Sequence, residues 1–304
     1  MILSAVICTH NPRRDYLDRT LAALKAQTLT QEQWELILID NRSDVALRDV
    51  LDLRWHPQSR MVREEDLGIL PARVRGLKEA KAELILFVDD DNVLAPDYLE
   101  QAIAIGATHS FLGVWGGAIA PEFETPPPDW IGPFRHLLAC VEVEADRWSN
   151  LKFSYATIPP TAGMCLRRVV AETFVEVVRN DPRRKLLGRR GKQQLTNGED
   201  TDLALTACDI GLGMGQFKRL RLTHLIPASR LRGDYLLSLA EGTAFCAHIL
   251  GALRGHPPQV PHSAPVRKLL GNLRRMTWSS RRRRHFEGQL RALNTACRLV
   301  AEWP

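Results

Sequence analysis

Three apolar segments in the first third of the chain each end in a cluster of polar side chains. The segments and their polar ends are 3–9 with Thr9-His10-Asn11, 34–39 with Asp40-Asn41, and 84–88 with Asp89-Asp90-Asp91. Such short, continuous apolar runs are typical of strands buried on both faces of a sheet. Ligands of open α/β sheets bind beyond the carboxyl ends of the strands, so we expect the three clusters to converge on one crevice.

Helical patterns separate these predicted strands. Residues 15–27 place Leu17, Leu21 and Leu24 on one face, residues 70–82 are also helical, and Pro96 opens a further helix. Strands that alternate with helices predict an α/β fold with a parallel sheet and crossover helices. No GxGxxG follows the first strand and no GxxxxGK[ST] is present, which disfavours a dinucleotide-binding Rossmann domain or a P-loop.

The later part of the chain has a different character. Residues 119–160 hold seven prolines together with Trp130 and Trp148, which predicts a long, partly ordered loop over the crevice. Residues 234–253 are predicted as a helix and 255–265 as a proline-rich linker. A basic tail from 266 is expected to form one or two helices.

Composition and length narrow the class of protein. The chain has 304 residues, of which 45% are hydrophobic and 25% charged, so a disordered or fibrous protein is excluded. Uninterrupted apolar runs fall short of the ~18–20 residues of a membrane span, and the start lacks the basic region of a signal peptide. The six cysteines form no CxxC pair, which argues against a zinc site and predicts a reducing, cytoplasmic location.

The triplet Asp89-Asp90-Asp91 is the first candidate for chemistry. Three adjacent carboxylates repel one another, and a hard divalent cation shared with phosphate oxygens relieves that repulsion. The alternative is an acidic cap before the helix at Pro96, or a solvated turn. The buried strand that precedes the triplet favours the metal site.

Two further candidates lie near the end of the predicted domain. In Gly198-Glu199-Asp200-Thr201-Asp202, one carboxylate could act as a general base, although an acidic first helical turn is the common alternative. His224 ends a basic, alternating stretch, and a single histidine is more often structural than a metal ligand.

Six short segments occur in an order that resembles glycosyltransferase family 2. They are Val6-Ile-Cys-Thr-His-Asn, Ile39-Asp-Asn-Arg-Ser-Asp, Leu67-Gly-Ile-Leu-Pro-Ala-Arg, Phe87-Val-Asp-Asp-Asp-Asn, Ala162-Gly-Met-Cys-Leu-Arg-Arg and Gly198-Glu-Asp-Thr-Asp-Leu. The resemblance covers residues 1 to about 230. It implies a GT-A fold, which is a Rossmann-like mixed sheet with helices on both faces. It also implies a nucleotide-sugar donor, a divalent metal (Mn²⁺ or Mg²⁺) and inversion at the anomeric carbon.

The resemblance also implies roles for single residues on the donor side. Thr9 and Asn11 would line the nucleotide pocket, and Asp40 would bind the base. Arg73 would contact the nucleotide or its phosphates, and the floor under the transferred sugar would be formed by Gly163 and Met164.

The remaining roles concern the metal and the acceptor. Asp89 and Asp91 match the outer residues of the DxD motif. Asp89 and Asp90 would bind the donor, Asp91 would be the direct metal ligand, and His224 would complete the metal site. Asp200 matches the catalytic base, and Glu199 and Trp130 are placed on the acceptor side. Two departures from the family pattern concern donor recognition: Val74 replaces an asparagine, and Asn41-Arg42 replaces Asn-Gly.

The basic tail has three interpretations that the sequence leaves open. From Arg267 onward, ten lysines and arginines against two glutamates give +8, whereas the first 266 residues carry about −2. Interleaved with leucines, Trp278 and Phe286, these charges suit an anionic membrane surface. Arginine runs also bind nucleic acid. Alternatively, the apolar residues pack on the domain while the arginines remain solvated.

The sequence therefore predicts a catalytic GT-A domain at 1–232 and a helical C-terminal extension at 233–304. Within the domain, 1–118 would bind the nucleotide and 119–232 the acceptor. The predicted reaction is inverting transfer from a nucleotide sugar, with UDP favoured, to a hydroxyl of a glycan or lipid-linked glycan. Surface polysaccharide or glycolipid synthesis, at the inner face of the membrane, is the expected setting. A non-catalytic nucleotide-sugar-binding relative and a nucleic-acid-binding protein are the alternatives, and the second leaves the acidic crevice unexplained.

Overall fold

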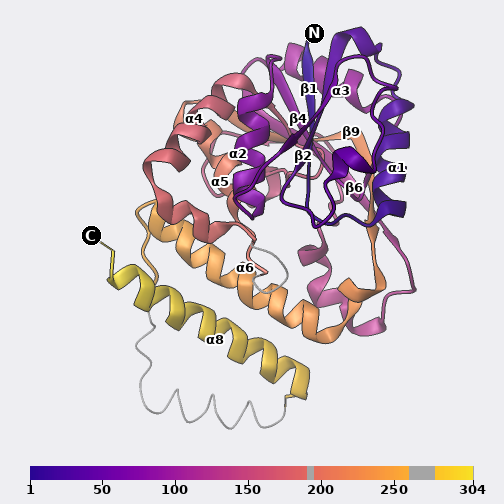
Figure 1. Cartoon of the computed structure of the whole chain (residues 1–304). Coiled ribbons are helices and arrows are strands. Elements are labelled where there is room, and N and C mark those ends of the chain that lie inside the picture. Colours follow the sequence, from indigo (N-terminus) through magenta and orange to yellow (C-terminus); the bar gives the residue numbers. More distant parts are fainter. Residues whose placement is uncertain (190–194, 260–277, 304) are drawn as a thin grey trace.

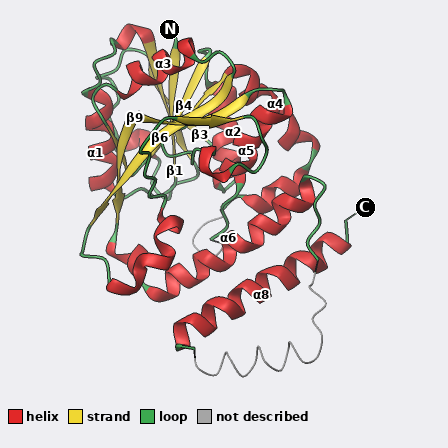
Figure 2. Ribbon diagram, turned by 180° about the vertical axis from the view of Figure 1, so that it is seen from behind, coloured by secondary structure: helices red, strands yellow, loops and turns green. Residues whose placement is uncertain are grey.

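The computed structural model of the chain describes residues 1–189, 195–259 and 278–303. Its centre is a nine-stranded mixed sheet in the order β3-β2-β1-β4-β8-β6-β9-β5, with β7 paired to β9. Helices cover both faces of the sheet, and two long helices lie side by side below it (Figure 1 and, from behind, Figure 2). The strands are β1 Leu3–Thr9, β2 Trp34–Asp40, β3 Ser59–Arg63, β4 Leu84–Asp89, β5 Asn92–Leu94, β6 Leu112–Phe123, β7 Arg147–Ser149, β8 Cys165–Arg167 and β9 Gly213–Ile226.

Seven α-helices and several short 3-10 helices connect these strands within the described residues. The α-helices are α1 Arg14–Lys25, α2 Ile69–Glu79, α3 Tyr98–Thr108, α4 Arg168–Asn180, α5 Glu199–Asp209, α6 Gly233–Leu253 and α8 Ser280–Ala301. The 3-10 helices that matter for the site are η3 Asp129–Leu138 and η6 Ala228–Leu231. Except for the tail, each predicted helix and strand is present, with ends that differ from the prediction by a few residues at most.

The first half of the sheet is parallel, as predicted. Strand β1 pairs in parallel with β2 on one side and β4 on the other, and β3 adds to β2. Strands β1 and β2 are buried along their whole length. Helices on both faces explain this burial, and burial on both faces explains why the sequence shows continuous apolar runs here.

The second half of the sheet departs from the predicted parallel arrangement. Strand β8 is antiparallel to both β4 and β6, and β5 and β7 are antiparallel to β9. Strand β6 pairs with β9 as far as Phe123, so residues 119–123 belong to the sheet and the long loop begins after them. The sheet is therefore mixed, as the family resemblance implies.

Two hydrophobic cores flank the sheet. On one face, α1 and α3 pack against the sheet through residues such as Leu17, Leu21 and Leu99. On the other face, α2 packs on β1 and β2, and α4 and α5 pack on β6. Helix α6 contributes Cys246 and Ile249 to that core. A smaller cluster joins η3, η6 and the start of α6 beside the site.

Helix α8 packs along α6, and the two run in the same direction (Figure 1). The buried residues of α8 are Gly288, Ala292 and Ala296, which recur every four residues and let the helices approach closely. Ion pairs Arg284–Asp234 and Arg291–Glu241 flank this contact. The packing interpretation of the tail is therefore correct for α8; the basic residues at 267–275 lie outside the described residues.

Helix α6 is long and apolar enough to cross a membrane, with a mean hydropathy of 1.5 over an 18-residue window, and no other helix in the described ranges is. The sequence had not suggested a span here. Core helices of folded proteins meet the same condition, and Leu236, Ile249 and Leu250 of α6 are buried in this domain. We therefore describe α6 as a core helix between the sheet and α8.

Candidate active site

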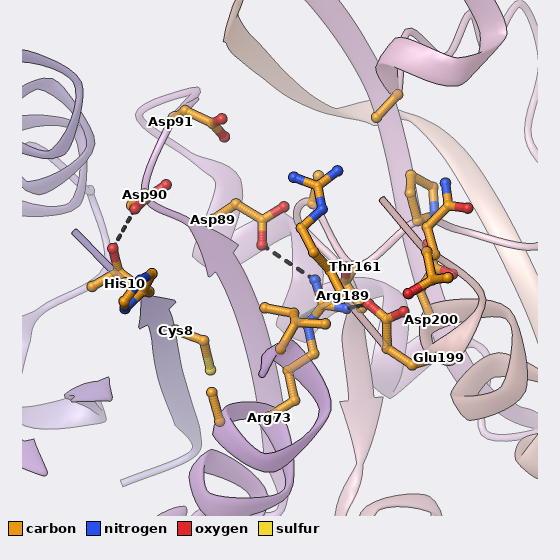
Figure 3. A pocket seen from close by; sticks show the side chains of 18 of the residues that line it. Cys8, His10, Arg73, Asp89, Asp90, Asp91, Thr161, Arg189, Glu199 and Asp200 are labelled. Carbon is orange, nitrogen blue, oxygen red and sulfur yellow. Dashed lines mark hydrogen bonds and ion pairs between the residues drawn. The ribbon is translucent and has the colours of Figure 1, made fainter. Parts of the chain in front are cut away.

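A cavity of about 400 Å³ opens at the carboxyl ends of β1, β2 and β4. The three polar clusters predicted to converge all contribute to its wall, through Thr9, His10 and Asn11, through Asn41, and through Asp89 to Asp91. The start of α5 forms the opposite side, as Figure 3 shows. Tyr235 and Leu239 of α6 also line the cavity, so the predicted boundary at residue 232 runs through the site.

The three aspartates after β4 have different partners. Asp89 lies 3.5 Å from Arg73, and Asp90 accepts a hydrogen bond from the Thr9 hydroxyl. Burial raises the pKa of Asp89, and burial together with the charge of Asp91 raises the pKa of Asp90 to about 7. Burial alone would also raise the pKa of Asp91, but Arg230 holds it below its ordinary value. Asp91 is therefore the member of the cluster whose ionised form is favoured most.

Asp91 and His224 are arranged as two ligands of one metal ion. The Oδ2 atom of Asp91 lies 3.4 Å from Nε2 of His224. Neighbouring ligands on an ion with bonds of ~2.1–2.2 Å are separated by roughly 3.0–3.5 Å. Nδ1 of His224 lies 3.0 Å from the Leu138 carbonyl, so Nδ1 carries the proton and Nε2 presents a lone pair.

No group of three His, Cys, Asp or Glu side chains that could hold a metal occurs in the described part of the chain. Two protein ligands leave positions open for phosphate oxygens and water, as in sites where Mg²⁺ or Mn²⁺ accompanies a nucleotide. The residues present therefore fit a divalent ion that is shared with a phosphate-bearing ligand.

The acids at the start of α5 separate into three environments. Glu199 is buried and pairs with Arg73. Asp202 is buried between Arg184 and Arg254. Asp200 alone lines the cavity without an ion pair among the described residues, and its Oδ1 accepts a hydrogen bond from the Thr201 backbone N–H at 2.7 Å. Asp200 is thus the carboxylate best placed to accept a proton from a molecule in the cavity.

Arg73 links the two acidic clusters. It projects from α2, is only 7% exposed, and donates to Glu199 through Nη1 and to Asp89 through Nη2. Burial alone would lower the pKa of Arg73, but the surrounding carboxylates raise it above its ordinary value. The guanidinium therefore stays charged and holds the two walls of the cavity together (Figure 3).

Asn11 and Asp40 shape the wall on the nucleotide side. Asn11 has a positive φ of 49°, its backbone N–H donates to Ser43, and its side chain bonds both the backbone and carboxylate of Asp44. Asp40 does not line the cavity, because its carboxylate accepts from Ser43 N, Leu47 N and Arg63. Asp40 therefore stabilises the turn after β2, and its predicted bond to a nucleotide base stays a prediction.

Gly163 and Met164 lie behind the cavity wall, which is formed here by Pro160, Thr161 and Ala162. Met164 is fully buried. Gly163 has φ +77°, and a Cβ there would lie 2.4 Å from the Tyr98 hydroxyl, so a glycine is required. The two residues support the wall, and their predicted contact with a sugar stays a prediction.

Trp130 does not line the cavity. Its ring packs on Phe134 within η3, and the guanidinium of Arg281 lies 3.8 Å from its centroid. Trp130 therefore lies at the interface between η3 and the C-terminal helix, and its predicted place on the acceptor side stays a prediction.

Several cavity residues were not found from the sequence. They are Thr161, Arg189, Asn197, Arg230 and Tyr235. His10 and Asn41 belong to the polar clusters predicted to converge here, although neither of them was assigned a role of its own from the sequence. Arg189 and Arg230 carry no local pattern that separates them from the many surface arginines.

Comparison with known proteins agrees with this geometry. Residues 4–170, more than half of the chain, match the family described as "Glycosyl transferase family 2". The chain belongs to glycosyltransferase family 2. Its mixed α/β fold is the GT-A fold.

Two curated relatives illustrate the range of the family. A validoxylamine A glucosyltransferase of Streptomyces hygroscopicus subsp. jinggangensis is 36% identical over 109 residues, which are 35% of this chain and 26% of that protein. A glucosyl-dolichyl phosphate glucuronosyltransferase of Haloferax volcanii is 24% identical over 151 residues, 47% of this chain and 46% of that one. The matched segment spans about a quarter of the first relative's length.

Solved structures share the fold at low identity. Residues 1–349 of S. aureus TarS, crystallised with UDP-GlcNAc, align with a TM-score of 0.54 at 17% identity over 83% of this chain and 67% of that one. A longer TarS structure aligns with a TM-score of 0.52 at 18% identity, over 92% of this chain and 44% of that one.

Proposed function

We propose that this glycosyltransferase is inverting and metal-dependent, and that it transfers a sugar from a UDP-sugar donor to a hydroxyl group of a glycan or lipid-linked glycan. The proposal rests on a candidate metal site and a candidate catalytic base that face each other across one cavity. Asp91 and His224, which are spaced to hold one metal ion, form one side, and the carboxylate of Asp200, which has no ion pair among the described residues, forms the other. The choice of UDP rests on the TarS fragment crystallised with UDP-GlcNAc, which shares this fold.

The bound metal would supply Lewis-acid stabilisation of the negative charge that develops on the diphosphate leaving group. Asp91 and His224 would hold it, and the histidine ligand favours Mn²⁺ over Mg²⁺, which prefers oxygen ligands. The chain's own cations add to this: Arg189 and Arg230 line the same cavity.

Asp200 would accept the proton of the attacking hydroxyl. Figure 3 shows Asp200 and Glu199 across the cavity from Asp90 and Asp91. A sugar that lies between them would have its leaving group on the aspartate side and its attacking hydroxyl on the Asp200 side. Attack from the face opposite the leaving group inverts the anomeric centre in a single displacement.

A donor screen tests the reaction. The full-length protein is incubated with a panel of nucleotide sugars and Mn²⁺, and hydrolysis is followed with and without EDTA. The NMR coupling constant of the first-formed sugar reports its anomeric configuration. Turnover that EDTA leaves unaffected would exclude the metal, and retention of configuration would exclude the single displacement.

The location at an anionic membrane surface rests on the outer face of α8. Arg282, Arg283, Arg284 and Arg298 are exposed, and neither Arg283 nor Arg298 has an acidic partner among the described residues. Each basic residue near an anionic surface contributes ~1 kcal/mol, and salt weakens the attraction. The apolar face of α8 is occupied by α6, so this would be electrostatic attachment of a cytoplasmic enzyme to the inner face of its membrane.

Charge reversal tests this location without removing the packed helix. Arg283→Glu with Arg298→Glu should reduce sedimentation with anionic vesicles at low salt and leave thermal unfolding unchanged. Arg291→Ala, which removes a charge paired with Glu241, is the control. A wild-type protein that ignores anionic vesicles at low salt would contradict the proposal, and binding of RNA instead would favour the nucleic-acid alternative.

A further inference from the structure

Arg230 occupies the space between the two candidate metal ligands. Its Nη1 atom lies 3.2 Å from Oδ2 of Asp91 and 3.0 Å from Nε2 of His224. These are the same two atoms that would bind a metal. An Nη1 group carries two hydrogens, so it can donate to both the carboxylate and the imidazole lone pair at once.

Arg230 and a metal ion would bond to the same two atoms, so they cannot occupy the site at the same time. A metal bonded to Oδ2 and Nε2 at ~2.1–2.2 Å would lie closer to Nη1 than two cations tolerate, unless the guanidinium moves away. We propose that Arg230 is an internal competitor of the metal: it neutralises Asp91 in the empty enzyme and must leave before the ion binds. This inference rests on the proposed metal-dependent function.

The local structure allows this movement of the side chain. Arg230 lies in η6, where its backbone N–H bonds to Pro227, and the next residue, Leu231, is buried in the cluster with Leu236. The backbone is therefore anchored. The side chain is 29% exposed and lines the cavity, so it can rotate into open space without crossing the core.

Burial gives the competition its strength. The side chains of Asp91 and His224 are only 8% and 7% exposed, so solvent screens their bonds to Arg230 weakly. Arg230 stays charged, because the carboxylate of Asp91 outweighs the effect of burial on its pKa. A free metal ion must break these bonds unaided. An ion that arrives with a diphosphate brings negative charge, which offers the displaced guanidinium a new partner.

The consequence is that metal and nucleotide bind as a coupled pair. The enzyme should bind Mn²⁺ weakly alone and much more tightly with UDP. Arg230 is in this sense a positioning residue: it acts through Asp91 and His224 and controls when they are available.

Equilibrium Mn²⁺ binding to the full-length chain tests the proposal without turnover. The signal of free Mn²⁺ in electron paramagnetic resonance is titrated in the absence of nucleotide. Arg230→Met should bind Mn²⁺ more tightly than the wild type by roughly tenfold to a hundredfold, the range that one buried charge-assisted hydrogen bond supports. Arg230→Gln, which is neutral and polar, serves as a second variant and should shift the affinity in the same direction.

Arg189→Met is the matched control, because it removes one positive charge from the same cavity without touching Asp91 or His224. Its Mn²⁺ affinity should change much less. Equal affinities of wild type and Arg230 variants would overturn the proposal, and so would equal gains from Arg189→Met and Arg230→Met, which would reflect net charge alone. If the proposed metal-dependent function is wrong, a different result is expected: Mn²⁺ will not strengthen UDP binding in any of these proteins.

Discussion

Two acidic clusters face each other across the cavity, and they use their carboxylates differently. Asp89 to Asp91 follow a buried strand, and all three line the cavity. Glu199, Asp200 and Asp202 open a helix, where Arg73 and a pair of arginines neutralise two of the three and leave Asp200 open. The first cluster brings three acids to the cavity wall, with Arg73 and Arg230 as the arginine partners among the described residues, and suits a cation. The second keeps one acid and suits a proton acceptor.

The difference shows that the number of acids in a motif does not define its role. What matters is which cations the fold brings to each carboxylate and whether the carboxylate faces the cavity. Asp202 is enclosed by its arginines, whereas Asp91 and Asp200 line the cavity. Arg73 contributes to both clusters, 126 residues from Glu199 in the sequence. The following substitutions test this assignment.

Asp91→Asn should have the largest effect. Loss of the anionic metal ligand removes several kcal/mol of leaving-group stabilisation, so we expect Mn²⁺-dependent transfer to fall on the order of 10³-fold or more. Initial rates over a Mn²⁺ titration, with thermal unfolding as a check of folding, measure this. A variant with wild-type turnover at ordinary Mn²⁺ concentrations would remove Asp91 from the metal site.

Asp200→Asn should lower turnover by ~10²–10⁴-fold, the usual cost of losing a general base, while UDP affinity stays close to wild type. Steady-state rates and UDP calorimetry separate the two quantities. If UDP affinity fell as far as turnover, Asp200 would be a donor-binding residue. The neighbouring Glu199→Gln is the comparison, and its effect should appear in stability because Glu199 is paired with Arg73.

Asp202→Ala should destabilise the fold by ~3–5 kcal/mol, because it leaves Arg184 buried without a counter-charge and removes one of the two carboxylates that pair with Arg254. Urea unfolding measures the change. Asp200→Asn, by contrast, should change the free energy of unfolding by less than ~0.5 kcal/mol. Similar losses for the two variants would contradict the division of this cluster into structural and open acids.

Asp90→Asn should have an effect that depends on pH and is smallest at acidic pH. Burial and Asp91 raise the pKa of Asp90 from 3.8 to about 7, so the folded state retains a proton that the unfolded chain releases. The contribution of this group to stability therefore falls as pH rises through that window. The variant should gain stability relative to wild type between pH 4 and pH 8, measured as the difference in Tm; a constant difference would contradict the shift.

Much of the fold could be predicted because its signals are local. Strand β1 begins and ends where its apolar run does, and β2 and β4 extend one residue into their polar ends. The reversal at β8 was missed, since a three-residue strand carries no periodicity from which to read direction. The extension of β6 into the proline-rich region was missed because pairing with β9, far along the chain, decides it.

The site was predicted in part for the same reason. Residues directly after strands, such as Thr9 and Asp91, could be placed because parallel strands carry their carboxyl ends to one edge. Asp40 is the exception: it ends a strand but its carboxylate bonds its own turn. Nothing in the segment around Trp130 indicates that Arg281 covers its ring, so this contact could not be predicted.

The sequence by itself determined the strands, the polar ends that line one cavity, and the family, because apolar runs and motif order are properties of neighbouring residues. Only the tertiary structure decided which charges are neutralised. Asp91 meets Arg230, Glu199 meets Arg73, and Asp202 meets Arg254 through contacts between distant segments. The energy of a charge depends on its burial and on its nearest counter-charge, and both are set by packing rather than by sequence position.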